Sequence, residues 1–510
     1  MGDAIPGHAL RRDTDENLHR FLRGVYHIPQ VYIATLEAAE ESLQGVFTEI
    51  DRRAALNQLR LLHIFQSHDV TDFHLNGSTG YGYGDSGREM LEQVFASYFG
   101  GETALVRSQI QSGTHAIALG LYGNLKPGDE LICAVGPPYD TLQKVIGLHG
   151  ETDSLIESGV SYREIPLAID VASRDMPLVS DTDSRETSFT PDVGYQAAAY
   201  RPREGAVVDL PRLLEAIGSR TKMVFLQRSK GYHWRSSVGI DELERILSAV
   251  KAKKPDVICI VDNCYCEMTE TREPGEVGAD LVIGSLIKNP GGTLAPCGGY
   301  IVGKAPYVEA CVRRLTAPGL SPDLGASLGF NRPTFQGLYQ APQVVSQSMK
   351  GAVLAGAFFG RLGYAVMPAS MPEPPLDATP NRSVSSPSDY ARTDEVSRIL
   401  RHRTDIVQAI RLGSEDKLLR FCRAIQKACP LDASFAPEPA MLPGYSHPVI
   451  MAGGGFIQGS SSELSADGPV RPPYDAFLQG GFSLAQIRLG LLLAATDLDA
   501  LAPIQAESGQ

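Results

Sequence analysis

Two ionisable residues stand at the ends of short apolar runs. Residues 257–261 form a run rich in β-branched side chains that ends at Asp262, and a second run, 279–283, is followed five residues later by Lys288. Such runs are typical of buried parallel strands, whose carboxyl ends carry the ligand sites of open α/β sheets. An acid and a lysine 26 residues apart at such ends suit pyridoxal phosphate. The amine can bind the aldehyde as a Schiff base, and the carboxylate can keep the pyridine nitrogen protonated.

Each of these residues alone also has a plainer interpretation. Asp262 could cap a helix at a strand-to-helix turn, and Lys288 could be a solvated surface lysine. However, Lys288 lies between an apolar run and the glycine-rich turn 289–292, which is a poor position for a solvated side chain. The pair therefore indicates a cofactor site more strongly than either member does.

Further predicted strand ends carry groups that suit a flat, phosphorylated molecule. The strand 103–110 is followed by the Ser-Gly-Thr segment 112–114, which opens an apolar helix. Free N–H groups and the helix dipole favour a phosphate there, although many α/β helices begin this way without binding anything. Tyr139 follows the strand 130–135 and could stack on a cofactor ring, or it could be an ordinary turn tyrosine.

A glycine-rich stretch, 76–88, carries aromatic and cationic side chains. It contains five glycines, so it cannot form a regular element, and it allows close backbone approach to a ligand. Its Tyr81, Tyr83 and Arg88 suit an aromatic ring and a phosphate, and a flexible surface loop is the alternative.

The polar segment 227–235 follows another apolar run, 222–226. We expect Gln227 to contact the cofactor and Arg228 the substrate. The strand–helix alternation over 104–302 predicts an α/β fold with a mostly parallel sheet that helices cover on both faces.

Composition describes an ordinary soluble globular protein. The chain has 510 residues, of which 43% are hydrophobic and 21% charged, enough for two domains with substantial cores. Its net charge of −13 argues against a nucleic-acid surface. No apolar run is long enough for a membrane span, and the N-terminus lacks the apolar segment of a secretory signal.

Cysteine usage suggests a reducing compartment. The eight cysteines follow no disulfide framework, so we expect a cytoplasmic protein. Cys264 and Cys266 form the only close pair, and without a second pair they are expected to be plain thiols and not metal ligands.

The pattern along the chain predicts three regions. The expected boundaries are 1–75 for an N-terminal helical segment, 76–340 for a large cofactor domain, and 341–510 for a helical connection from about residue 342 and a small C-terminal domain. A polar insertion is expected at about 173–205 and a disordered one at about 368–395. We expect residues 403–429 to be mostly helical and 463–479 to form strand and loop.

Several stretches resemble the bacterial aluminium-resistance proteins, relatives of methionine γ-lyase and cystathionine β-lyase. They are SGTHAIALGLYGNL, PPYDTLQKVIG, FLQRSKGYHWRSS, GSLIKNPGGTLAPCGGYIVG and IQGSSSELSADGPVRPPYDAFLQGG. The resemblance covers nearly the whole chain outside the two insertions. It implies a fold-type-I pyridoxal phosphate enzyme with a large domain and a smaller α+β C-terminal domain. It also implies a homodimer or homotetramer with an active site shared between subunits.

The resemblance also implies roles for the residues at the strand ends. Lys288 would bind the aldehyde, Asp262 would pair with the pyridine nitrogen, and Tyr139 would stack on the ring and protonate the departing sulfur. The phosphate would be bound by Ser112, Gly113, Thr114 and Ser285.

Two further roles fall outside the predicted sheet. Tyr81 or Tyr83, with Arg88, would reach the phosphate of the neighbouring subunit, although their spacing is wider than the Tyr-x-Arg of the lyases. An arginine of the small domain would bind the substrate carboxylate, with Arg471 the first choice and Arg488 the second.

Together these features predict a carbon–sulfur lyase acting on a sulfur amino acid such as cystathionine, methionine or cysteine. The Lys288 amine would remove the α-proton, and loss of a β- or γ-sulfur substituent would lead to a 2-oxo acid and ammonia. The alternatives are an aminotransferase or replacement enzyme, which share the first steps, and a cofactor-binding metal-tolerance protein with little catalysis.

Overall fold

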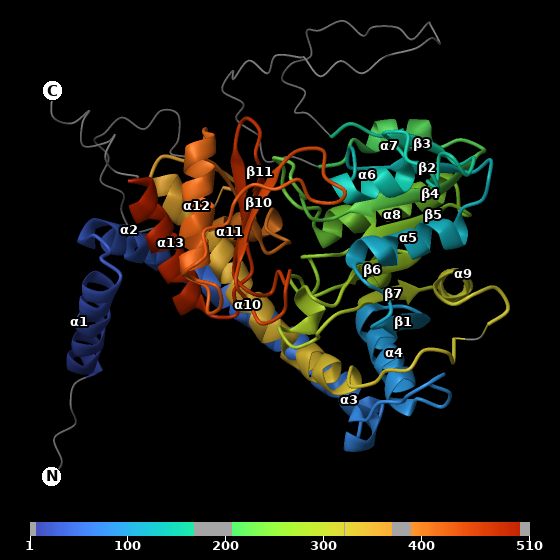
Figure 1. The fold of residues 1–510 in the computed structure, drawn as a ribbon, viewed down its shortest axis with the longest axis horizontal. Coiled ribbons are helices and arrows are strands. Elements are labelled where there is room, and N and C mark those ends of the chain that lie inside the picture. Colours follow the sequence, from blue (N-terminus) through green and yellow to red (C-terminus); the bar gives the residue numbers. More distant parts are fainter. Residues whose placement is uncertain (1–6, 168–206, 321, 370–388, 500–510) are drawn as a thin grey trace, which may run out of the picture.

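A computed structural model describes residues 7–167, 207–320, 322–369 and 389–499. The first predicted insertion lies outside these residues, and of the second only the two ends are described. Two β-sheets occupy separate halves of the molecule, and the long helix α10 extends from the second sheet to the helices of the first half (Figure 1).

The first sheet has seven strands in the order β1-β7-β6-β5-β4-β2-β3. Only β7 runs antiparallel to its neighbours, so the predicted mostly parallel α/β sheet is confirmed. The strands are β1 Thr103–Arg107, β2 Glu130–Cys133, β3 Ser161–Glu164, β4 Thr221–Gln227, β5 Ile258–Asp262, β6 Leu281–Ser285 and β7 Gly299–Gly303.

Helices cover both faces of this sheet because alternate side chains of its strands enter different cores. Ile260 and Ile283 pack against α5, α6 and α9, whereas Val261 and Val282 pack against α4 and α8. The covering elements are α4 Ser86–Phe99, α5 Gly113–Asn124, α6 Asp140–Ile146, α7 Leu210–Ala216, α8 Ile240–Lys253, η3 Pro274–Val277, η4 Asn289–Gly291 and α9 Ala305–Leu315.

The N-terminal region is helical, as expected. It contains α1 Gly7–Val25, α2 Gln30–Ser42, α3 Gln44–Ser67 and the short η1 Asp72–Leu75. Helix α3 lies beside α10, which spans Asn331–Arg361 and contacts both halves of the molecule (Figure 1). The predicted start of this helix at residue 342 is too late, because Pro342 lies inside the helix. Buried side chains on both sides of the proline hold the helix continuous.

The second sheet has five strands in the order β10-β11-β12-β9-β8, each antiparallel to its neighbours. Its elements are β8 Ala365–Met367, α11 Asp389–Arg401, β9 Val407–Arg411, α12 Glu415–Lys427, β10 Val449–Gly453, β11 Ser465–Pro469, β12 Asp475–Gln479 and α13 Leu484–Leu498. The expectation of helix over 403–429 is wrong in its first part. The strand β9 is buried along almost its whole length, and such a short apolar run has no period that separates strand from helix. None of the helices in the described ranges is long and apolar enough to cross a membrane.

Candidate active site

A cavity of about 280 Å³ lies where the carboxyl ends of β4, β5 and β6 face the second sheet. The parallel register places Gln227 directly beside Asp262 at this edge. Predicted residues that line the cavity are Ser112, Gly113, Thr114, Tyr139, Gln227, Asp262, Ser285 and Lys288. Five separate strand-end segments of the sequence therefore converge on one space.

Lys288 lies in the loop that follows β6, and its ammonium group packs on an aromatic ring. Its Nζ is 3.5 Å from the centroid of the Tyr265 ring. Burial alone would lower the pKa of Lys288, but the acidic groups of Tyr265, Cys264 and Asp262 outweigh burial and raise it. Tyr265 has a φ of 71°, a left-handed conformation that costs a non-glycine residue about 1–3 kcal/mol. This conformation presents its ring to the lysine.

Asp262 ends β5 and is buried. Burial raises the pKa of its carboxyl group, and the opposing effects are the charge of Lys288 and hydrogen bonds from Cys264. The backbone N–H of Cys264 donates to Asp262 Oδ1 at 3.1 Å. A buried carboxylate with a free lone pair can accept a hydrogen bond from a protonated ring nitrogen. Burial, and then the charge of Asp262, raise the pKa of the Cys264 thiol well above its usual value.

The start of α5 also lines the cavity and could bind an anion. Ser112 caps the helix, and its Oγ accepts the N–H of His115 at 3.1 Å. The N–H groups of Gly113 and Thr114 belong to the first turn and have no acceptor within the helix. A Cβ at Gly113 would lie 3.3 Å from Cys264 Sγ, so only glycine fits here without displacing a neighbour. Ser285 Oγ is buried and has no hydrogen-bond partner in the described part of the chain.

Tyr139 precedes α6 and also lines the cavity. Its hydroxyl donates to Thr114 Oγ1 at 3.0 Å, and its backbone N–H donates to Gln227 Oε1 at 3.3 Å. Burial, and then the charge of Asp262, raise the pKa of Tyr139 well above its usual value, so its hydroxyl keeps its proton. A neutral phenol in this position can both cover a flat ring and donate a hydrogen bond.

These features fit pyridoxal phosphate. Phosphates bind at helix starts with free N–H groups, and the unsatisfied Ser285 hydroxyl adds one donor. The buried Asp262 suits the ring nitrogen and the Lys288 amine suits the aldehyde.

The opposite wall comes from residues that the sequence analysis did not identify. They are Tyr232, Tyr445, Asp467, Phe477 and Gln479, and all line the cavity. Asp467 and Phe477 are register partners in β11 and β12, so their side chains lie on the same face of the second sheet. No local pattern brings these strands together with the first sheet. Tyr265 was also missed, although its position three residues after Asp262 is a usable signal.

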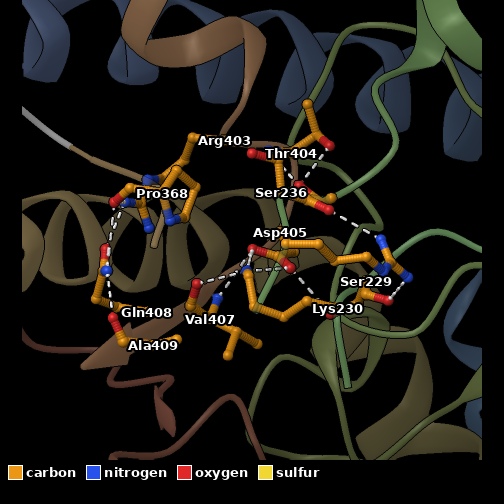
Figure 2. Close-up of polar contacts among 12 residues, drawn as sticks. Ser229, Lys230, Ser236, Pro368, Arg403, Thr404, Asp405, Val407, Gln408 and Ala409 are labelled. Carbon is orange, nitrogen blue, oxygen red and sulfur yellow. Dashed lines mark hydrogen bonds and ion pairs between the residues drawn. The ribbon is translucent and has the colours of Figure 1, made fainter. Parts of the chain in front are cut away.

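A buried polar cluster joins the two walls (Figure 2). Lys230 follows β4 and is fully buried, as is Asp405, which precedes β9. Lys230 Nζ lies 2.8 and 2.7 Å from the two carboxylate oxygens of Asp405 and 2.9 Å from the carbonyl oxygen of Val407. Ser229 donates to Asp405 Oδ2 at 2.9 Å. Ser229 and Val407 line the cavity, so this cluster fixes the distance between its walls.

The structure places Arg228 away from the cavity. Its guanidinium is fully buried and donates to Asn263 Oδ1 at 2.7 Å and to the Val238 carbonyl oxygen at 3.1 Å, and it forms an ion pair with Glu270. All sides of the group are thus occupied within the fold. The prediction that Arg228 contacts the substrate is therefore corrected to a structural role.

Neither predicted carboxylate-binding arginine lines the cavity in the single chain. Arg488 Nε pairs with Glu40 at 3.2 Å, where α13 packs on α2. Arg471 is exposed in the turn between β11 and β12. The pKa of His233 is lowered to about 4, mainly by burial, then by the charge of Arg235 and then by the charge of Arg471. His233 follows the cavity residue Tyr232, so Arg471 is the nearer candidate.

The glycine-rich loop also lies outside the cavity of its own chain. Tyr81 and Tyr83 are 72% and 66% exposed, and their ring centroids are 5.6 Å apart. Arg88, in contrast, is 2% exposed, and its Nη1 donates to the carbonyl oxygens of Gly82 and Gly325 at 2.9 and 2.8 Å. The prediction that Arg88 projects toward a neighbouring subunit does not agree with this position, because its side chain fixes the loop from inside.

Comparison with known proteins places these features in a family. The family described as methionine gamma-lyase matches residues 32–191, 188–374 and 389–499. YnbB of Bacillus subtilis (strain 168), a protein of uncharacterised function, is 40% identical over 466 residues, 91% of this chain and 96% of YnbB. A carbon–sulfur lyase involved in aluminium resistance from Clostridium novyi is 35% identical, with a TM-score of 0.78 over 94% of this chain and 99% of its own. The pyridoxal phosphate-dependent protein YhfS of Escherichia coli shares the fold alone, at 16% identity and a TM-score of 0.50 over 88% of this chain and 97% of its own. The chain belongs to the methionine gamma-lyase family.

Proposed function

We propose that this protein is a pyridoxal phosphate-dependent carbon–sulfur lyase that acts on a sulfur amino acid by β- or γ-elimination. The observation that carries the proposal is the convergence of Lys288, Asp262, the α5 start and Ser285 on one cavity. The name of the similar Clostridium novyi lyase supports the reaction class. Family membership favours a lyase over an aminotransferase, a replacement enzyme or a cofactor-binding protein with little catalysis.

Pyridoxal phosphate, when bound, supplies an electron sink for negative charge that develops at the substrate α-carbon. In this proposal, the Lys288 amine would hold the aldehyde in the resting enzyme and, once the substrate amine has taken its place, would move the proton from the α-carbon. The Asp262 carboxylate would accept a hydrogen bond from the protonated ring nitrogen and so keep that nitrogen charged. Gly113, Thr114 and Ser285 hold the phosphate and so fix the position of the ring.

Tyr139 serves the leaving group in this proposal. Its hydroxyl retains its proton at neutral pH and donates to Thr114, and both residues line the cavity. It can therefore donate a proton to the departing sulfur.

We also propose that the enzyme is a homodimer or homotetramer with a shared active site. Support comes from the two exposed tyrosines, Tyr81 and Tyr83, which form an aromatic pair with no role inside their own subunit's cavity. Arg471 is proposed to bind the substrate carboxylate. A cytoplasmic location is supported by the eight free thiols, which suit a reducing compartment.

The test is cleavage of sulfur amino acids by protein purified with pyridoxal phosphate. Release of a thiol and a 2-oxo acid from cystathionine, methionine or cysteine derivatives is the expected result. The Lys288→Ala variant should release neither, while its circular dichroism spectrum matches that of the wild type. Transfer of the amino group to a 2-oxo acid acceptor, without thiol release, would favour the aminotransferase alternative instead.

A further inference from the structure

The second-sheet wall of the cavity combines one carboxylate with aromatic rings. The Tyr232 ring centroid is 5.1 Å from that of Phe477 and 6.2 Å from that of Tyr445. Asp467 lies on the same face as its register partner Phe477. Aromatic faces and a carboxylate are the groups that bind an ammonium ion in a partly desolvated site.

A neutral amide holds the Asp467 carboxylate in place without neutralising it. Gln479 Nε2 donates to Asp467 Oδ2 at 3.3 Å. The Tyr232 side chain also acts to lower the pKa of this carboxyl group. Neither side chain is cationic, so the charge of the carboxylate stays available to a ligand.

The charge balance of the cavity also favours a cationic ligand. Asp140, Asp262 and Asp467 line it, and Lys288 is the only lysine or arginine among the described residues that do so. In the proposed function, the Lys288 amine binds the cofactor aldehyde. Asp467 is then left without a cationic partner in the cavity lining.

The two walls of the cavity would contact different parts of a bound substrate. The groups proposed to hold the cofactor lie on the first-sheet side, and Lys288 marks the position of the reacting carbon. Asp467, Tyr232 and Tyr445 lie across the cavity from these groups, where the substituent on the substrate sulfur would extend. We propose that Asp467 determines specificity, and that the enzyme selects amino acids whose distal substituent carries an ammonium group. This inference rests on the proposed function for the placement of the substrate.

Binding can be tested with two amino acids that contain no scissile sulfur. L-Lysine and L-2-aminoheptanoate have side chains of equal length and differ only in the terminal ammonium. Calorimetric titration of the holoenzyme at about pH 8 should give an affinity for L-lysine about 10- to 100-fold higher, the effect of one charge-assisted contact. Asp467→Asn should bring the two affinities to within a few-fold without weakening L-2-aminoheptanoate. Asp140→Asn, a change to another carboxylate of the cavity, should preserve the preference.

Equal affinities in the wild type, a preference that survives in Asp467→Asn, or binding of neither amino acid would overturn the inference. Cleavage is measured separately with S-(2-aminoethyl)-L-cysteine and S-propyl-L-cysteine. Cleavage of both at equal rates, together with equal binding of the first pair, would leave the lyase proposal standing and overturn the specificity. A preference for L-lysine that depends on Asp467, without cleavage of either cysteine derivative, would support the cation subsite and contradict the lyase proposal.

Discussion

Removal of one partner from the buried Lys230–Asp405 pair should destabilise the protein strongly. In Asp405→Asn the Lys230 ammonium loses its counter-ion and keeps only neutral acceptors, such as the carbonyl oxygen of Val407. Both partners are 0% exposed, so water cannot replace the lost carboxylate. Breaking such a pair from one side costs about 3–5 kcal/mol.

Urea unfolding measures this cost through the single tryptophan, Trp234. This residue packs beside Val407 and against Arg411, so its fluorescence reports on the junction between the walls. The midpoint of Asp405→Asn should fall by roughly 1 M urea. Asp475→Asn is the matched control: it breaks the more exposed pair between Arg411 and Asp475 and should cost about 1 kcal/mol or less.

A double variant separates pairing from packing. Lys230→Met with Asp405→Leu removes both charges and fills the space, and it should recover most of the loss. The pKa of Asp405 is lowered: burial would raise it, but the Lys230 charge and hydrogen bonds outweigh burial. The stabilisation is therefore present above the unfolded value of about 3.8 and should disappear as the pH falls below it. An unchanged midpoint in Asp405→Asn, or a double variant no more stable than the single one, would show that the Lys230–Asp405 pair does not stabilise the fold in this way.

Three further predictions concern the cavity. Asp262→Asn should leave the circular dichroism spectrum unchanged and slow exchange of the substrate α-proton by about two orders of magnitude or more, because a neutral pyridine is a poor electron sink; exchange at the wild-type rate, measured by NMR in D₂O, would remove Asp262 from this role. Ser285→Ala should weaken pyridoxal phosphate binding about tenfold in equilibrium dialysis, the effect of one hydrogen bond to a charged group, and an unchanged affinity would mean that the unsatisfied hydroxyl does not face the phosphate. The preference for L-lysine over L-2-aminoheptanoate should increase as the pH rises through about 7, because burial raises the pKa of Asp467 to about 7 against the effects of Lys288, Tyr232 and Gln479. The neighbouring side chains have raised pKa values and stay neutral at this pH; they are Tyr232, Tyr265, Tyr445 and Cys422. A preference that does not vary with pH would therefore contradict the role of Asp467.

The first-sheet side of the site was predictable because its signals are local. Asp262 and Lys288 each follow an apolar strand, and strands of a parallel sheet end at a common edge. The residue types of segment 112–114 likewise indicate a helix start. Each signal needs only a few neighbouring residues, so the sequence is sufficient to identify it.

The opposite wall depends on contacts between distant segments, which no local pattern specifies. Asp467 and Phe477 meet the cavity only because β11 and β12 pair and face the first sheet. The position of Asp405 could not be predicted, because residues 403–429 were expected to be mostly helical. Arg228 was misplaced for a similar reason. It follows a strand as a ligand residue would, but its partners Asn263 and Glu270 lie 35 and 42 residues away.

The identity of the lysine that binds pyridoxal phosphate tests the central claim most directly. The protein is incubated with the cofactor, reduced with borohydride, digested, and its peptides are mapped by mass spectrometry. We expect the pyridoxyl group on Lys288, and we expect Lys288→Ala to lose both this peptide and the visible absorbance of the complex. Labelling at another lysine with activity retained in Lys288→Ala would contradict it, and Lys230 is the informative competitor because it lies behind the same cavity.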